Sequence, residues 1–286
     1  MQTLLLWILT LAAFVVFSWR FWVRLRPLLQ ARPAARFDQP GERLSGVFGD
    51  IGLHRRLLKL TYSGVLHALI FSSFLVLFTA ILQAFGSGLF PGFTLAPIGG
   101  ETWIALLQEI FALLILAGLA MAAWQRLVVK PARFDGSKKG DATLIYFLAT
   151  GIVATMLLEF ASEIATHGSM HGYRPVSNLL AQGLMGFGVA GEAAEVSRGV
   201  FYWAHILVIL GFLVYIPGSK HRHMFLAAPN IYFRPLTPKG QLPPPPAKLQ
   251  EEDAGVVQSF QDFTWKDLYD SLSCTECGRC QSVCPA

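Results

Sequence analysis

The sequence lacks, or nearly lacks, three features that are typical of soluble proteins and nucleotide-dependent enzymes. Charged residues make up only 14% of the 286 residues while 53% are hydrophobic, a balance too apolar for an ordinary soluble domain. No cysteine precedes position 274, which excludes a disulfide framework across the chain. No glycine-rich phosphate-binding fingerprint follows a predicted strand, so we expect no nucleotide cofactor. The composition indicates an integral membrane protein.

The formal net charge of +5 does not come from one basic surface. Lysines and arginines occur in short clusters beside long apolar runs, where membrane orientation accounts for them better than nucleic-acid binding does. We therefore expect a lipid membrane as a partner and no nucleic acid.

The first apolar run, residues 3–23, has about the length of ~20 residues that crosses a hydrocarbon core. No basic segment precedes it and no small-residue cleavage site ends it, so a retained helix is favoured over a signal peptide. The connection after it is rich in basic residues: Arg24, Arg26, Arg32, Arg36, Arg43, Arg55, Arg56 and Lys59. Such a connection belongs on the cytoplasmic side, which places the amino terminus outside.

Four more apolar runs follow, at residues 60–85, 103–127, 142–164 and 200–217. The connection after the second run has no lysine or arginine, whereas those after the third and fifth runs carry several. This alternation satisfies the preference for positive charge on the cytoplasmic side at every loop. The sequence therefore predicts an all-α membrane protein with five transmembrane helices.

Beyond the last run, the stretch GQLPPPPAKLQEED predicts a semi-rigid, exposed linker. A short helix is expected after it, because Thr264 and Asp267 have the spacing of a capping box. Trp265, Leu268 and Leu272 can share one apolar face of this helix. The helix leads directly into a cysteine-rich segment.

All the cysteines lie in that final segment, as Cys274, Cys277, Cys280 and Cys284, followed by Pro285. The C-x2-C-x2-C-x3-C-P spacing is that of bacterial-type ferredoxins, in which three thiolates bind one [4Fe-4S] cluster and the fourth binds a neighbouring cluster. Structural zinc is the alternative, although zinc sites usually pair two separated C-x2-C elements. The sequence stops two residues after Cys284, before either cluster has its full ligand set, so we expect the natural polypeptide to continue.

Two histidines lie within apolar runs, His67 in the second and His205 in the fifth. An ionisable side chain within a lipid-spanning helix is unfavourable unless something engages it. Two histidines on antiparallel helices can ligate a haem iron axially, and a hydrogen-bonded packing role is the alternative for each. Beside a cluster motif, the pair favours haem b.

Two further histidines, His54 and His223, lie just past the cytoplasmic ends of the second and fifth runs. On continuous helices His205 and His223 are about 27 Å apart, and His54 and His67 about 20 Å, at 1.5 Å per residue. Pairing His67 with His205 and His54 with His223 would hold two stacked haems across the membrane. The alternatives are one haem between His67 and either His205 or His223, replacement of His223 by His221, and a basic juxtamembrane turn at His54.

Other polar side chains near the outer ends of the runs give less specific signals. His167 and His171, an i, i+4 pair, fit either a metal site on one helix face or solvated histidines. Glu159 and Glu163 fit either a quinone pocket or proton path, or the membrane boundary.

The segment WAHILVILGFLVYIPGSKHRHMFLAAPN resembles the last helix of the haem b gamma subunit of respiratory nitrate reductase. The resemblance implies that His205 and His223, 18 positions apart, each ligate a haem, and that Pro217 ends the helix before the second ligand. In that subunit another helix carries two closely spaced histidines. Here His67 has no such neighbour, and Leu77 occupies one candidate position of the deeper ligand.

The order of the whole sequence, a gamma-like haem domain followed by WKDLYDSLSCTECGRCQSVCPA, resembles membrane-bound electron-transfer-flavoprotein:menaquinone oxidoreductases and related heterodisulfide-reductase-like proteins. The resemblance covers essentially all of the sequence. It implies a membrane cytochrome b domain at residues 1–235, a proline-rich linker at 236–258 and the start of a [4Fe-4S] ferredoxin-type domain at 259–286.

The function that this resemblance implies is respiratory electron transport at the bacterial cytoplasmic (inner) membrane, with the iron–sulfur segment in the cytoplasm. Haem b, as one or two groups, and a [4Fe-4S] cluster would relay electrons between a soluble flavoprotein or iron–sulfur donor and menaquinone. Two alternatives stay open. One is an anchor subunit of a heterodisulfide-type or sulfite-related reductase that draws electrons from quinol, and the other is a structural membrane anchor that docks a soluble partner.

Overall fold

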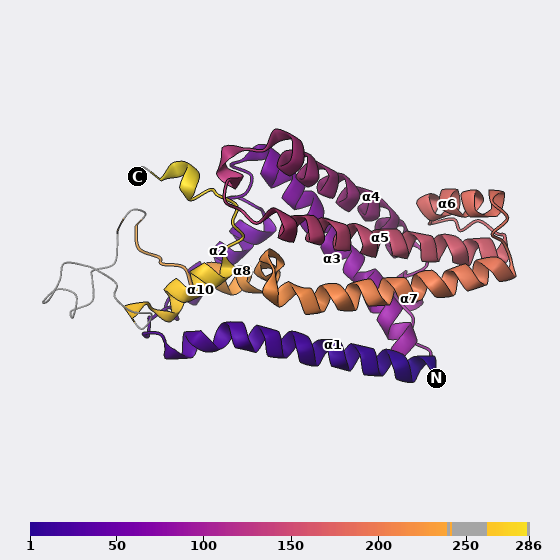
Figure 1. The fold of residues 1–286 in the computed structure, drawn as a ribbon, viewed down its shortest axis with the longest axis horizontal. Helices are drawn as coiled ribbons and strands as arrows, with labels where there is room; N and C mark the ends of the chain where they lie inside the picture. Colours follow the sequence, from indigo (N-terminus) through magenta and orange to yellow (C-terminus); the bar gives the residue numbers. More distant parts are fainter. Residues whose placement is uncertain (239–240, 242–261, 285–286) are drawn as a thin grey trace, which may run out of the picture. The chain divides into compact units, whose positions relative to one another are not determined.

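The structure is a computed structural model that describes residues 1–238, 241 and 262–284. Five long helices are apolar enough to cross a membrane: α1 (Gln2–Leu25), α3 (Thr61–Leu89), α4 (Trp103–Trp124), α5 (Lys139–His167) and α7 (Glu192–Tyr215). The shorter helices in the described part of the chain are α2 (Pro40–Val47), α6 (Pro175–Gly186), α8 (His223–Tyr232) and α10 (Trp265–Ser273) (Figure 1). The described residues contain no β-strand. The predicted all-α membrane fold with five spans is confirmed.

The long helices contain nearly all of the predicted spans and extend beyond most of them. The largest extension is in α7, which begins at Glu192 rather than at residue 200. Its first turn carries Glu192 and Glu195, and negative charge at a helix amino terminus is favourable because the helix dipole is positive there. Polar residues can therefore continue the helix outside the hydrocarbon layer, where hydropathy gives no signal.

Contacts divide the chain into two compact units, which are described separately. Unit 1 contains Met1–Phe17, Leu57–Ile216 and Cys277–Ala286. Unit 2 contains Ser18–Arg56 and Pro217–Glu276. The predicted linker at 236–258 lies almost entirely outside the described residues, and the predicted domain boundaries stay predictions.

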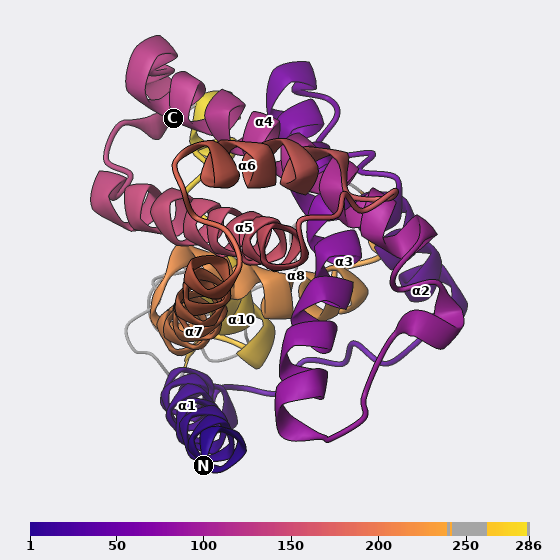
Figure 2. The ribbon, with the colours of Figure 1, turned by 90° about the vertical axis from the view of Figure 1, so that its right-hand side faces the viewer.

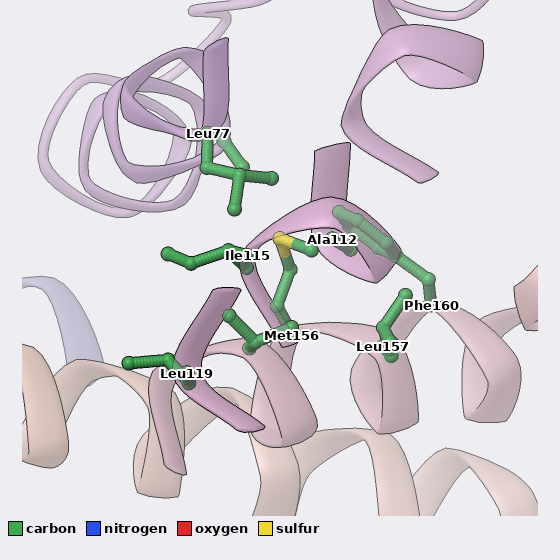
Figure 3. Close-up of a cluster of buried hydrophobic side chains, with 9 residues drawn as sticks. Leu77, Ala112, Ile115, Leu119, Met156, Leu157 and Phe160 are labelled. Atoms are coloured by element: carbon green, nitrogen blue, oxygen red, sulfur yellow. The ribbon is translucent and has the colours of Figure 1, made fainter. Parts of the chain in front are cut away.

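In unit 1, α5 packs along α7, α3 packs along α4, and α4 also meets α5. Figure 2 shows α7 nearly end-on, with α5 running obliquely across the view above it. The core between α3, α4 and α5 is made of aliphatic and aromatic side chains, and Figure 3 labels Leu77, Ala112, Ile115, Leu119, Met156, Leu157 and Phe160. Gly118 lets α3 approach α4 closely, since a Cβ there would lie 2.8 Å from Ile70 Cγ1. Small residues at such crossings are typical of membrane helices.

Large apolar side chains also cover the outer faces of the long helices. Examples are Val15 on α1, 67% exposed, Leu113 on α4, 50% exposed, and Leu207 on α7, 52% exposed. A soluble monomer rarely exposes so much contiguous apolar surface. These faces are explained by contact with lipid, which accepts them without an energetic penalty.

The short helix α6 is held on unit 1 by a buried carboxylate on α4. Glu109, 1% exposed, accepts hydrogen bonds from the Ser177 backbone N–H at 2.9 Å and from its hydroxyl at 2.6 Å. Arg174, 6% exposed, places its guanidinium 3.6 Å from the centre of the Phe160 ring and 3.9 Å from the Glu109 carboxylate. Burial lowers the pKa of Arg174, and the neighbouring Glu109 charge opposes that shift. Sequence patterning did not predict α6, because its connection is rich in glycine.

Unit 2 is held together by hydrogen bonds to backbone carbonyls. Arg43, 1% exposed, donates to the carbonyls of Tyr232 and Arg234 at 3.0 and 2.7 Å, which ties α2 to the end of α8. It also pairs with Asp38 at 2.7 Å, and this hydrogen bond lowers the pKa of Asp38. The predicted capping box at the start of α10 is confirmed, with Thr264 and Asp267 bonded reciprocally.

Lysine at the start of α10 fixes that helix against α8 within unit 2. Lys266, 3% exposed, donates to Asn230 on α8 at 2.7 Å and to Asp270 at 2.6 Å. The Trp265 indole donates to the Ala34 carbonyl at 3.0 Å and lies edge-on to Phe233. The helix that precedes the cysteines is therefore docked on its own unit.

We expect Glu109→Ala to lower the stability of the protein markedly. The substitution leaves the Arg174 charge buried without its partner and removes both hydrogen-bond acceptors of Ser177. Breaking a buried ion pair on one side lowers the free energy of unfolding by about 3–5 kcal/mol. Denaturant unfolding in detergent micelles, with hydrogen exchange at α6, measures the effect.

The matched control is Glu195→Ala, which removes an i, i+3 ion pair with Arg198 on the exposed face of α7. Exposed pairs contribute little, so the control should unfold nearly as the unaltered protein does. Equal destabilisation by both substitutions would contradict a special role for the buried carboxylate.

Candidate functional site

His205 lies on α7 inside the helix bundle of unit 1 and is 1% exposed. Its Nδ1 is 3.0 Å from the Ile152 carbonyl oxygen and 3.0 Å from the Thr155 hydroxyl, both on α5. A carbonyl can only accept a hydrogen bond, so this contact assigns the ring proton to Nδ1. The buried Nε2 then carries a lone pair, and it has no hydrogen-bond partner.

This arrangement is the one that metal-binding histidines use. A ligating imidazole usually donates its other ring N–H to a backbone carbonyl or carboxylate, which fixes the tautomer and the ring orientation. A purely structural buried histidine would instead be expected to have both nitrogens satisfied. The unpartnered Nε2 of His205 therefore fits an axial haem ligand, while that role stays a prediction.

His67, the predicted partner of His205, lies on α3 in the same unit and is partly buried. Its ring stacks on Phe71 with centroids 6.4 Å apart. Leu77, at the candidate position of a deeper ligand, belongs to the apolar core with Ala112 and Ile115. The structure thus gives Leu77 a packing role.

His223 and His54 both belong to unit 2. His223 begins α8, and its Nδ1 is 2.9 Å from the Lys220 carbonyl oxygen, which assigns the same tautomer as at His205. Burial lowers the pKa of His223, which favours the neutral form that a metal requires. His54 is 5% exposed and has a backbone φ of 51°, a left-handed conformation that is uncommon for residues with a side chain.

Each predicted histidine pair lies within one unit: His67 and His205 in unit 1, and His54 and His223 in unit 2. The ligand roles of all four histidines stay predictions. His221 lies beside His223, with ring centroids 5.4 Å apart.

The second half of the cysteine segment belongs to unit 1 and packs on the connection between α4 and α5. Arg133 donates to the Cys277 carbonyl at 2.7 Å and to the Ser63 hydroxyl at 2.8 Å. Gly278 has φ of 69°, and a Cβ there would lie 1.7 Å from the Arg133 carbonyl oxygen. Only glycine fits this close approach. Partial burial lowers the pKa of Arg133, although an arginine remains charged.

The first half of the segment belongs to unit 2, where it is tied to the basic turn before α8. Lys220 forms an ion pair with Glu276 at 2.8 Å, and Arg222 donates to the Leu272 carbonyl at 2.7 Å. The Glu276 backbone N–H lies 3.4 Å from Cys274 Sγ. These contacts bring the segment that bears Cys274 to the turn that bears His223.

The cysteines themselves are thiols without disulfides: Cys274, Cys277, Cys280 and Cys284. Within the described ranges, no three His, Cys, Asp or Glu side chains converge on a point that could hold a metal ion. The spacing nevertheless matches the ferredoxin pattern in which three thiolates bind one iron–sulfur cluster and the fourth binds a neighbouring cluster. Pro285, the last position of the motif, lies outside the described residues.

The histidines of the connection after α5 do not share a helix. α5 ends at His167, and Gly168 follows with φ of 65°, so His167 and His171 lie on no common helix face. The His171 ring instead accepts a hydrogen bond from the Tyr173 backbone at 3.2 Å. A metal site on one helix face is therefore not supported, and Glu159 and Glu163 stay open candidates on α5.

Sequence reasoning missed the side chains that hold the cysteine segment. The sequence identifies Arg133, Lys220 and Arg222 only as part of the charge bias that orients membrane helices. Their contacts with the cysteine segment join residues that are distant in sequence, so no local pattern predicts them. The glycine in CTECGRC was the one available clue to the close approach at Gly278.

Comparison with known proteins agrees with the iron–sulfur interpretation. Residues 265–286 match the 4Fe-4S binding domain family Fer4_2. The chain is similar to the probable iron-sulfur-binding oxidoreductase FadF of Bacillus subtilis (strain 168), with 29% identity over 97% of this chain and 39% of that protein. It is also similar to the EtfAB:quinone oxidoreductase of Syntrophomonas wolfei, with 26% identity over 99% of this chain and 40% of that protein.

The chain therefore spans about two fifths of the length of these relatives. No solved structure matches it. Together the matches support an iron–sulfur cluster at the cysteine segment, and the names of both relatives describe oxidoreductases. The start of an iron–sulfur domain after the five-helix bundle is thereby confirmed.

We expect Arg133→Gln to loosen the cysteine segment. The shorter, neutral side chain loses the bond to the Cys277 carbonyl, so the backbone at residues 277–280 should exchange its amide hydrogens faster and the iron should be removed more rapidly by a chelator. Hydrogen exchange followed by mass spectrometry measures the first effect, and loss of the cluster absorbance measures the second.

Arg126→Gln is the matched control, because Arg126 packs on the same Phe134 ring but bonds to Ser137. It should leave exchange at residues 277–280 unchanged. Identical chelation rates in the two variants and the unaltered protein would show that Arg133 does not hold the segment.

Proposed function

We propose that this chain is the membrane portion of an oxidoreductase that relays electrons between a soluble flavoprotein or iron–sulfur donor and menaquinone through haem b. Two contacts support the proposal most directly: Lys220 pairs with Glu276, and Arg222 bonds to Leu272. They connect the turn that bears His223, a candidate haem ligand, to the segment that bears Cys274, a candidate cluster ligand. Both relatives are named as oxidoreductases, and the name of one includes a quinone, which supports a quinone as the redox partner.

The residues fit haem b at the candidate histidines. His205 would hold the iron through its unpartnered Nε2, with Ile152 and Thr155 fixing the ring, and His67 is the proposed partner. His223, whose Nδ1 bonds to the Lys220 carbonyl, is the proposed ligand in unit 2, with His54 as its proposed partner. A bound haem supplies reversible one-electron transfer, while the chain sets its position and its burial.

The cysteine segment would deliver electrons to, or accept them from, the haem at the turn that bears His223. Lys220 is 11% exposed and Glu276 is 40% exposed, so their ion pair is partly shielded from water and is screened less than a surface pair. With Arg222 bonded to Leu272, the turn and the segment are held at two points. Attachment at two points would keep the proposed cluster and the proposed haem at a constant separation.

The distribution of lysine and arginine supports a bacterial inner-membrane orientation with the amino terminus outside and the cysteine segment in the cytoplasm. The proposed domains are a membrane cytochrome b domain at 1–235, a linker at 236–258 and the beginning of a ferredoxin-type domain at 259–286. The proposed donor is an electron-transferring flavoprotein, because the name of one relative specifies EtfAB.

Haem content tests the proposal. We expect purified protein to show the absorption bands of reduced b-type haem, and His205→Leu to remove one haem per chain because the iron loses an axial nitrogen. His54→Leu should remove a second haem if two are present. Pyridine haemochrome spectra give the haem-to-protein ratio.

His171→Leu is the control, since His171 lies in a connection outside the bundle and should leave the haem content unchanged. A purified protein without b-type bands would overturn the haem assignment. An unchanged ratio in His54→Leu would eliminate that residue as a ligand.

The two-point attachment of the cysteine segment is tested with Lys220→Met. Loss of the ion pair with Glu276 should slow electron transfer between cluster and haem severalfold while the haem and iron contents stay constant. Stopped-flow spectroscopy follows both absorbances, and Lys220→Arg should restore much of the rate.

Lys59→Met, at an exposed lysine, provides the control for removal of one positive charge. An unchanged transfer rate in Lys220→Met would show that the attachment does not govern the separation of the two groups.

A further inference from the structure

A cleft of about 360 Å³ lies in unit 1 where the first turn of α1, the last turns of α3 and the first half of α7 meet. Its lining includes Leu6, Gly88, Arg198, Tyr202 and Trp203. Leu6, Tyr202 and Trp203 also belong to the apolar core around Ile206, and charged side chains join them here to give a mixed composition. It is the composition of a site for an amphipathic small molecule.

Gly88 allows Leu6 and Tyr202 to pack closely over α3 beside this cleft. A Cβ at that position would lie 2.2 Å from the Tyr202 hydroxyl and 2.5 Å from Leu6 Cδ2. Tyr202 in turn lies edge-on to Trp203, with ring centroids 5.7 Å apart. The cleft therefore presents two aromatic rings and an aliphatic wall over a position where any side chain larger than glycine would intrude.

Hydrogen-bond donors are available at the same place. Arg198 uses Nε and Nη2 to bind Glu195, which leaves its Nη1 donors for a ligand. The Tyr202 hydroxyl is 3.4 Å from the Ala84 carbonyl, a long contact that a better acceptor can replace. A flat ring with carbonyl oxygens would stack on the aromatic side chains and accept from both donors.

The position of the cleft along α7 points to redox chemistry. Tyr202 and Trp203 precede His205 by three and two residues, so the cleft lies within about one helical turn of the candidate haem ligand. Tyrosine and tryptophan at the end of a membrane helix also match phospholipid headgroups, but a site within about one helical turn of the candidate haem ligand favours a redox-active occupant.

We propose that this cleft binds the headgroup of a quinone, which rests on the proposed function. The quinone takes up two electrons, one at a time, from the haem that His205 would hold, and two protons from solvent at this end of the helices, and becomes quinol. Oxidation of quinol reverses each of these transfers. Glu195, which also lines the cleft, is the ionisable group beside the ring.

Equilibrium dialysis of menadione, a naphthoquinone without a tail, against the purified haem-loaded protein in lipid nanodiscs tests the site. We expect Gly88→Val to displace Leu6 and the Tyr202 ring from the wall of the cleft and Arg198→Gln to remove a charged donor, each weakening binding about tenfold or more. Both variants should keep the haem spectrum. Glu192→Gln, in the same first turn of α7 but outside the cleft, should bind as the unaltered protein does.

Fluorescence gives a readout that does not depend on the stability of the variants. Menadione should quench the unaltered protein, and Trp203→Phe should lose a large part of the quenching. Menadione binding that survives in both cleft variants would overturn the site alone. If Gly88→Val releases a bound phospholipid without changing the affinity for menadione, the cleft is a lipid site. If the unaltered protein binds no menadione, both the site and the proposed function fail.

Discussion

Hydrocarbon offers no hydrogen bonds, and this constraint organises the bundle around α5 and α7. Polar side chains on these helices satisfy one another: Tyr215 donates to Asp141, His205 bonds to the Ile152 carbonyl, and Ser197 bonds to Ser162 at 3.0 Å. In lipid such polar contacts stabilise the association of helices. A sliding movement of one helix would leave several polar groups unpaired, so together they fix the height of His205 in the bundle.

The same hydrogen bond that satisfies His205 also prepares its chemistry. A backbone carbonyl cannot change its role as an acceptor, so the ring must carry its proton on Nδ1. His223 repeats the arrangement with the Lys220 carbonyl, in a turn that has no sequence similarity to the α5–α7 contact. Two histidines from different surroundings thus have the tautomer that leaves Nε2 unprotonated. Ligation of a metal through Nε2 would use this tautomer at both positions.

The sequence predicts the long helices well because about 20 consecutive apolar residues have few alternatives. The helix limits of α7 were missed because Glu192 to Arg198 continue the helix outside the apolar layer. α2, α6 and α8 were missed because they are short and contain glycine or proline, and tertiary contacts such as Glu109 with Ser177 stabilise α6 where propensity does not. At the site, residue types identified the candidate ligands, but the Ile152 carbonyl beside His205 could not be predicted, since backbone groups look alike in a sequence.

Basic residues near the membrane have two effects in this chain, and the second explains their exact positions. The charge bias requires only that lysine and arginine lie on one side of the membrane, so any residue of a loop would satisfy it. Arg133 and Arg222, however, each donate to a carbonyl of the cysteine-bearing polypeptide, at Cys277 and Leu272. Under the proposed orientation these residues lie on the cytoplasmic side, where an iron–sulfur segment meets a reducing environment. Under that orientation, the charges that orient the helices would also be the groups that hold the cysteine segment.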